Sequence, residues 1–103
     1  MNITYKQSGN SCTVFVSGEL DEHTSVYTRN TLDKIISELN FGSQVVFDFS
    51  GLTFMDSTGI GVLLGRYKRH EKRGVSFVIK NTNTHIDRIL KMTGIYTLIP
   101  NVG

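Results

Sequence analysis

The sequence predicts a single α/β domain, a mixed sheet of four or five strands with helices packed against it. Segments with the two-residue alternation of strands are separated by segments with the period of amphipathic helices, in the order β-β-α-β-α-β-α-β. The 103 residues also suffice for one modest hydrophobic core and no more. We therefore expect one domain spanning residues 1–103.

The first half of the chain predicts a hairpin, a helix and a central strand. Residues 3–7 and 12–17 alternate around a Gly9-Asn10 turn, which places Cys12 on one face as a small buried side chain. A helix opens between Asp21 and Thr24. Its apolar residues follow helical spacing: Leu32, Ile35, Ile36 and Leu39. The apolar run 45–49 then predicts a strand covered on at least one face.

The second half predicts two more helices and two more strands. After a short extended stretch, residues 56–59 offer several N-cap residues in front of a helix whose basic end, residues 68–73, complements the helix dipole. Residues 75–79 form the next strand. A short helix beginning at Asn83 or Thr84 closes at Gly94, and Leu98-Ile99 form a last short strand. Strands joined through helices favour parallel crossovers, so the sheet is mixed.

Composition excludes several classes of protein. The net charge of +2 is too small for a typical nucleic-acid binder, and no apolar run approaches the ~18 residues of a membrane helix. The N-terminus lacks the pattern of a secretory signal, and one cysteine forms neither an internal disulfide nor a zinc cage. We expect a cytoplasmic protein without a nucleic-acid or membrane partner.

The loop 54–61, before the second helix, holds the most conspicuous polar cluster. A helix start carries unpaired N–H groups and the positive end of the dipole, and two hydroxyls, Ser57 and Thr58, lie there. On spacing alone, plain capping is the simpler explanation of these residue types. Nucleotide binding is weakly indicated, because Gly59-x-Gly61-x-x-x-Gly65 lacks the spacing of a dinucleotide fingerprint. We expect Gly61 and Gly65 instead to let the helix approach the sheet.

Two chemical interpretations of Ser57 remain. A serine nucleophile would need a histidine base, but no G-x-S-x-G elbow is present, and His23, His70 and His85 are all predicted to be exposed and without metal spacing. Alternatively, Ser57 is itself a substrate: a hydroxyl at a helix start accepts a phosphate without unfolding the helix. That role needs no base, metal or pocket.

Three segments resemble one known family. They are Gly18-Glu19-Leu20-Asp21 followed by His23-Thr24, Phe54-Met55-Asp56-Ser57-Thr58-Gly59-Ile60-Gly61-Val62, and Met92-Thr93-Gly94-Ile95. Over nearly its whole length the chain resembles the STAS-domain anti-sigma factor antagonists of bacterial partner switching. Gly65-Arg66-Tyr67-Lys68 is most similar to the sporulation branch of this family. The general-stress branch is the near alternative, and a small serine hydrolase using Ser57 is the alternative from another class.

The resemblance implies a mechanism. The serine after the loop aspartate, Ser57 here, is phosphorylated by the anti-sigma factor, which is an ATP-dependent serine kinase. The unphosphorylated antagonist binds that kinase and frees the sigma factor, and a PP2C-type phosphatase restores it. The resemblance thus implies a monomeric, cytoplasmic regulator that is not an enzyme and holds no metal or cofactor.

The predicted partner surface combines two loops at one edge of the sheet, where sites of α/β sheets commonly gather. Its members are Glu19, Leu20, Asp21, Asp56, Ser57, Thr58, Ile60 and Gly61. We expect Ile60 and Gly61 to be exposed. We also expect Asp21→Arg to weaken binding while leaving the thermal midpoint nearly unchanged.

Overall fold

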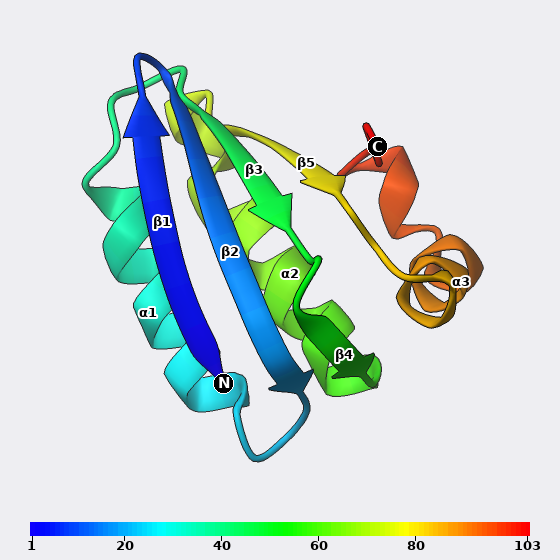
Figure 1. Ribbon diagram of the computed structural model, residues 1–103. Helices are drawn as coiled ribbons and strands as arrows, with labels where there is room; N and C mark the ends of the chain where they lie inside the picture. Colours follow the sequence, from blue (N-terminus) through cyan, green and yellow to red (C-terminus); the bar gives the residue numbers. More distant parts are fainter.

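A computed structural model describes all residues, 1–103, and shows a five-stranded mixed sheet with two helices packed on one face (Figure 1). The elements in chain order are β1 (Asn2–Ser8), β2 (Ser11–Leu20), α1 (Ser25–Ser37), β3 (Gln44–Asp48), β4 (Leu52–Met55), α2 (Ser57–His70), the 3-10 turn η1 (Glu71–Arg73), β5 (Ser76–Lys80), α3 (Thr84–Thr93) and the 3-10 turn η2 (Ile95–Thr97). The predicted fold class is confirmed.

The long strand β2 organises the sheet. It pairs with β1 in an antiparallel hairpin and with β3 in parallel, and β3 pairs in parallel with β5. β4 pairs in parallel with the last residues of β2, beyond the stretch that β3 covers. In Figure 1, β4 accordingly lies beyond the end of β3, next to the start of α2. This arrangement brings the end of β2 beside the loop that opens α2.

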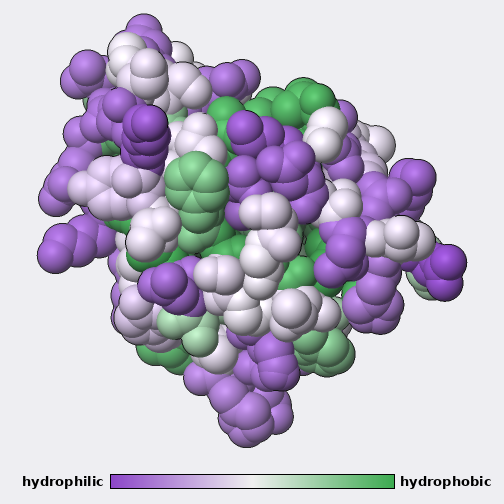
Figure 2. All heavy atoms as spheres, viewed as in Figure 1, coloured by the Kyte–Doolittle hydropathy of each residue, from purple (hydrophilic) through white to green (hydrophobic).

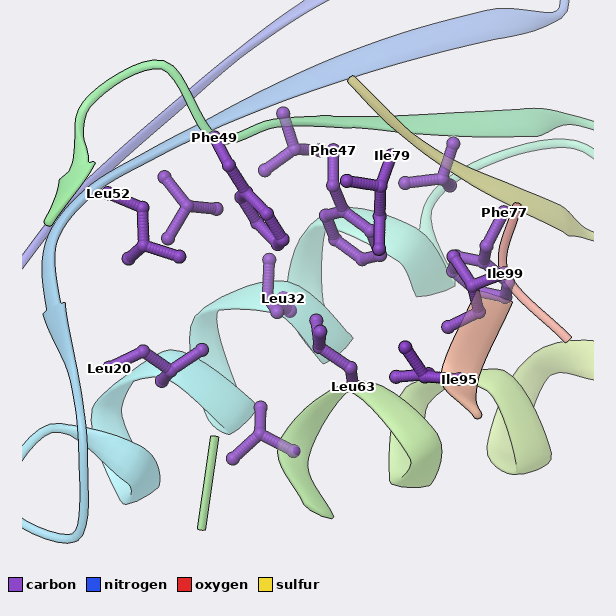
Figure 3. Close-up of a cluster of buried hydrophobic side chains, with 14 of the residues drawn as sticks. Leu20, Leu32, Phe47, Phe49, Leu52, Leu63, Phe77, Ile79, Ile95 and Ile99 are labelled. Atoms are coloured by element: carbon purple, nitrogen blue, oxygen red, sulfur yellow. The ribbon is translucent and has the colours of Figure 1, made fainter. Parts of the chain in front are cut away.

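The core lies between the sheet and the helices. Cys12, Val14 and Val16 are buried on the helix-facing side of β2, as predicted. Figure 3 shows the aromatic rings of Phe47 and Phe49 pointing toward α1 and α2, with Leu32 and Leu63 rising from those helices. The opposite face of the sheet carries no helix, and Figure 2 shows it as mostly hydrophilic or neutral, with hydrophobic residues scattered among them.

Two elements differ from the prediction. β4 is a fourth strand where only an extended stretch was expected; its burial does not alternate, since Leu52 and Met55 are buried and the two residues between them are exposed. The strand predicted at Leu98-Ile99 is absent. There, η2 turns the chain inward so that Ile99 is buried, and only Asn101 forms a β-bridge, to Ile79.

The seam between α1 and α2 contains a buried ionic cluster that corrects the prediction for His70. His70 is 3% exposed, and its Nε2 lies 2.9 Å from Oδ1 of Asp33 on α1. The same oxygen lies 2.8 Å from Nε of Arg66, which is also buried. The basic end of α2 is therefore not wholly a solvated face, because helical packing turns His70 inward, together with Arg66 one turn earlier.

Candidate functional site

Asp56 caps the N-terminus of α2. As the N-cap residue it has an extended backbone, and its Oδ1 accepts hydrogen bonds from the backbone N–H groups of Thr58, at 3.0 Å, and Gly59, at 3.2 Å. Two of the unpaired donors of the helix start are thereby satisfied. The predicted capping is confirmed, and it belongs to Asp56.

Ser57 is left free by this arrangement. It is the first residue of α2, it is exposed, and its hydroxyl takes part in no hydrogen bond of the structure. Thr58 is exposed beside it. The oxygen of a serine that only capped the helix would accept hydrogen bonds from backbone N–H groups, but here Asp56 accepts those of Thr58 and Gly59. The hydroxyl is thus available to an external group.

A bulge turns the end of β2 toward the start of α2. The register of the β2–β4 pair shifts between Gly18 and Glu19, and Gly18 has a φ of +106°, which favours glycine. Beyond the bulge, Leu20 pairs with Met55, and its carbonyl accepts a hydrogen bond from the N–H of Asp56 at 3.4 Å. The two predicted loops therefore lie side by side.

Gly59 is the glycine that permits this close approach. A Cβ added there would lie 2.7 Å from Cγ of Met55 and 2.9 Å from the carbonyl oxygen of Leu20. At Gly61 and Gly65 an added Cβ would meet nothing within 4 Å. The prediction that Gly61 and Gly65 let the helix approach the sheet is therefore wrong; the contact comes two residues before Gly61, at Gly59, where α2 meets β4.

The predicted partner surface divides into exposed and buried residues. Its exposed or half-exposed members are Glu19, Asp21, Asp56, Ser57, Thr58 and Gly61. Leu20 and Ile60 are only 1% and 7% exposed, because both point into the core. The expectation that Ile60 is exposed is wrong, and both side chains support the surface from beneath.

Asp21 also has a structural task that the sequence did not reveal. Its Oδ1 accepts hydrogen bonds from the backbone N–H groups of His23, at 2.9 Å, and Thr24, at 3.1 Å. These bonds hold the turn that leads into α1. Asp21→Arg would break them, so the expected unchanged thermal midpoint does not follow from this geometry. Glu19 is exposed, and its carboxylate makes no such bond, which makes it the cleaner position for a charge reversal.

The structure gives no histidine that serves Ser57 as a base. His70, the buried one, lies at the last residue of α2, about 20 Å from the first at ~1.5 Å per residue. His23 and His85 are exposed, as predicted. No three or more His, Cys, Asp or Glu side chains come together as metal ligands, and none of the helices is long and apolar enough to cross a membrane.

A small apolar groove beside Ser57 was not predicted. It lies between the start of α2 and α3 and has a volume of about 280 Å³. Its lining residues are Met55, Asp56, Ser57, Ile60, Ile89, Met92 and Thr93. The high exposure of Met92 is a property of how α3 packs, so the sequence pattern of α3 alone could not have located the groove.

The chain matches known proteins over nearly its whole length. Residues 2–102 match the STAS domain family. The anti-sigma F factor antagonist of Paenibacillus polymyxa is 38% identical over 87 residues, which are 84% of this chain and 74% of that protein. The anti-sigma-B factor antagonist of Bacillus subtilis is 28% identical over 99 residues, 96% of this chain and 88% of that protein.

A solved structure shows the same fold. The anti-sigma factor antagonist SpoIIAA in its unphosphorylated form superposes with a TM-score of 0.75 at 20% sequence identity, covering 99% of this chain and 89% of that chain. The family match and the relative at 38% identity extend across both loops of the site. This chain therefore belongs to the STAS domain family, among its anti-sigma factor antagonists.

Proposed function

We propose that this protein is an anti-sigma factor antagonist controlled by phosphorylation of Ser57. In its unphosphorylated form it binds an anti-sigma factor that is also a serine kinase and releases the sigma factor. That kinase phosphorylates Ser57, which ends the binding, and a PP2C-type phosphatase restores it. The protein acts as a cytoplasmic monomer and is not itself an enzyme.

The free Ser57 hydroxyl carries the proposal. It is exposed at a helix start whose cap is supplied by its neighbour Asp56, so it can accept a phosphate without losing a structural hydrogen bond. The helix dipole tolerates the added negative charge at this position. No histidine base supports the hydrolase alternative, since the only buried histidine, His70, is bound to Asp33 at the other end of α2.

The charge of the phosphate suffices to switch binding. A phosphoserine carries about −1.5 to −2 charges, beside the carboxylate of Asp56. A partner that fits around the neutral hydroxyl must strip water from this charge, and even a polar group without a compensating hydrogen bond costs roughly 2–7 kcal/mol to bury. Even a total of about 2–3 kcal/mol weakens binding roughly 30- to 150-fold.

The relatives favour the sporulation branch over the general-stress branch. The anti-sigma F factor antagonist of Paenibacillus polymyxa is 38% identical, and the anti-sigma-B factor antagonist of Bacillus subtilis is 28% identical. We therefore propose an anti-sigma-F type of partner for this chain.

The test is calorimetric titration against two probes, the anti-sigma F factor of Paenibacillus polymyxa and the anti-sigma-B factor of Bacillus subtilis, each with bound nucleotide. We expect binding to the first probe to be tighter. Tighter binding to the second probe would contradict the choice of branch, and binding to neither would overturn the proposed function.

Charge reversal at Glu19 tests whether the first loop belongs to the partner surface. Glu19→Arg removes an exposed carboxylate that makes no hydrogen bond, so the thermal midpoint should stay within about 2 °C, as for surface substitutions. The affinity of the variant for whichever anti-sigma probe binds the wild type should fall about tenfold or more. Glu38→Arg makes the same charge change at the exposed far end of α1 and is the matched control. Equal affinities of the two variants would remove the loop from the surface.

A further inference from the structure

We propose that the apolar groove between α2 and α3 is a second part of the docking surface. In it, the anti-sigma kinase inserts an apolar side chain that is flanked by a basic residue of the same kinase segment. This inference rests on the proposed function and adds α3 to a surface so far composed of the end of β2 and the start of α2. It also explains how a phosphate on Ser57 would weaken binding, because Ser57 lines the groove.

The groove has the size and position for a side chain of a partner. Its volume of about 280 Å³ lies just below the ~300–1,000 Å³ of typical small-molecule sites. Met55, Ile60 and Ile89 supply its apolar floor and walls, and Ser57 and Asp56 stand on the side of α2. A kinase that brings a phosphate to Ser57 must therefore lie over or beside the groove.

Met92 is the feature that the fold itself does not explain. It is 80% exposed, more than any other large hydrophobic side chain of the protein, and it lines the groove from α3. The core contacts of α3 come from Ile86 and Leu90, so Met92 is not needed to hold the helix. A flexible thioether at the rim of an apolar groove adapts readily to an inserted side chain.

The apolar lining of the groove suits an apolar side chain, and the charges around it favour a basic residue next to that side chain. Asp56 lines the groove and forms no ion pair, and neither do Glu19 and Asp21 at the end of β2, which pairs with β4; the ion pairs of the structure use only Asp33 and Asp87. On α3, Lys91 is paired with Asp87. The rim thus carries unpaired negative charge although the chain as a whole has a net charge of +2.

Phosphorylation of Ser57 would close the groove to such an occupant. Ser57 forms part of the wall, so the phosphate oxygens would stand at the mouth of an apolar space. An inserted apolar side chain would then strip water from a dianion without offering it hydrogen bonds, which is costly. The phosphate would also crowd the space that the side chain enters.

The test is the affinity of Met92 variants for whichever of the two anti-sigma probes binds the wild type. We expect Met92→Ala to weaken binding about tenfold and Met92→Lys about a hundredfold, because the first loses buried apolar area and the second also repels a basic neighbour. Met92→Leu keeps the apolar side chain and should stay within about threefold. All three should keep the thermal midpoint, since Met92 is exposed.

Val102→Lys is the matched control. Val102 is an exposed apolar residue beside Ile79 of β5, away from the groove, and its replacement should leave the affinity unchanged. An affinity of Met92→Lys equal to that of Val102→Lys would overturn the proposed groove while leaving the proposed function intact. Failure of the wild type to bind either probe would instead overturn the proposed function, and the groove with it.

Methyl NMR gives a second readout that does not depend on a substitution. The chain has three methionines, Met1, Met55 and Met92, so each labelled methyl group is resolved by assignment. We expect the Met92 methyl signal to shift when the probe is added to the unphosphorylated protein, and addition of the probe to the Ser57-phosphorylated protein to cause no further shift. A Met92 signal that does not move in the unphosphorylated complex would overturn the proposal.

Discussion

At the scale of single residues, the start of α2 divides its tasks among neighbours. Asp56 satisfies the backbone, Gly59 allows contact with β4, and Ser57 is left without a structural duty. Because capping and reactivity lie on different side chains, a modification of Ser57 need not disturb the fold. The proposed switch depends on this separation.

Alanine substitutions at Gly59 and Gly61 should change the stability of the protein in opposite directions. Gly59→Ala places a methyl group 2.9 Å from the carbonyl oxygen of Leu20 and 2.7 Å from Met55, so it should lower the free energy of unfolding by about 1–3 kcal/mol. Gly61→Ala meets nothing within 4 Å and should raise it by about 0.5–1 kcal/mol through helix propensity. Urea unfolding measures both. Equal effects of the two substitutions would refute the close approach at Gly59.

At the scale of elements, α1 and α2 are joined by a carboxylate of α1 that contacts two buried side chains of α2. Asp33 contacts both Arg66 and His70. Burial lowers the pKa of Arg66, while the charge of Asp33 and those of Arg29 and Arg69 act on it in opposite directions. The cluster joins the C-terminal half of α2 to α1.

Removal of Asp33 should therefore be costly. Asp33→Ala leaves the guanidinium of Arg66 buried without its counter-ion, so we expect a loss of about 3 kcal/mol in the free energy of unfolding. Glu38→Ala, at the exposed end of the same helix, should change it by less than about 0.5 kcal/mol. Chemical denaturation compares the two. A loss at Asp33 no larger than that at Glu38 would show that the seam is held by apolar packing alone.

At the scale of the whole molecule, the carboxyl edge of the sheet is tied together by ionised carboxylates. Burial alone would raise the pKa of Asp48, but hydrogen bonds from Ser50 and Asn81 and the charge of Lys80 lower it below its usual value. The pKa of Asp87 is lowered by hydrogen bonds from Tyr96 and Lys91. Both groups therefore favour the folded state only while they are ionised.

Acid should loosen this edge. A carboxyl whose pKa is lowered in the folded state contributes stability above its unfolded pKa of ~3.9, and this stability is lost as the pH falls through the folded value. We expect the urea midpoint to fall between about pH 5 and pH 2. Asp48→Asn should lower the midpoint at pH 7 but flatten this pH dependence. The same slope in wild type and variant would mean that Asp48 does not contribute.

The fold class and the location of the site followed from local patterns in the sequence. Periodicity indicated most of the strands and helices, and the residues around Ser57 indicated a helix start. The remaining features depend on packing between segments that are far apart in the sequence. The burial of His70 depends on Asp33, which is 37 positions away in the sequence, and β4 shows no alternation that a pattern could reveal. Leu20 and Ile60 bear apolar side chains whose direction is set by a bulge and a helix crossing.

The central claim is that Ser57 is the phosphate acceptor, and it is tested most directly by intact-mass analysis and peptide mapping after incubation with ATP and the anti-sigma F factor of Paenibacillus polymyxa. We expect the wild type and Thr58→Ala to gain one phosphate on Ser57, and Ser57→Ala to gain none while it still folds and binds. The phosphorylated wild type should bind roughly 30- to 150-fold more weakly, because the partner would have to desolvate the phosphate. A Ser57→Ala protein that still gains one phosphate, or a phosphoprotein that binds as tightly as before, would contradict the account.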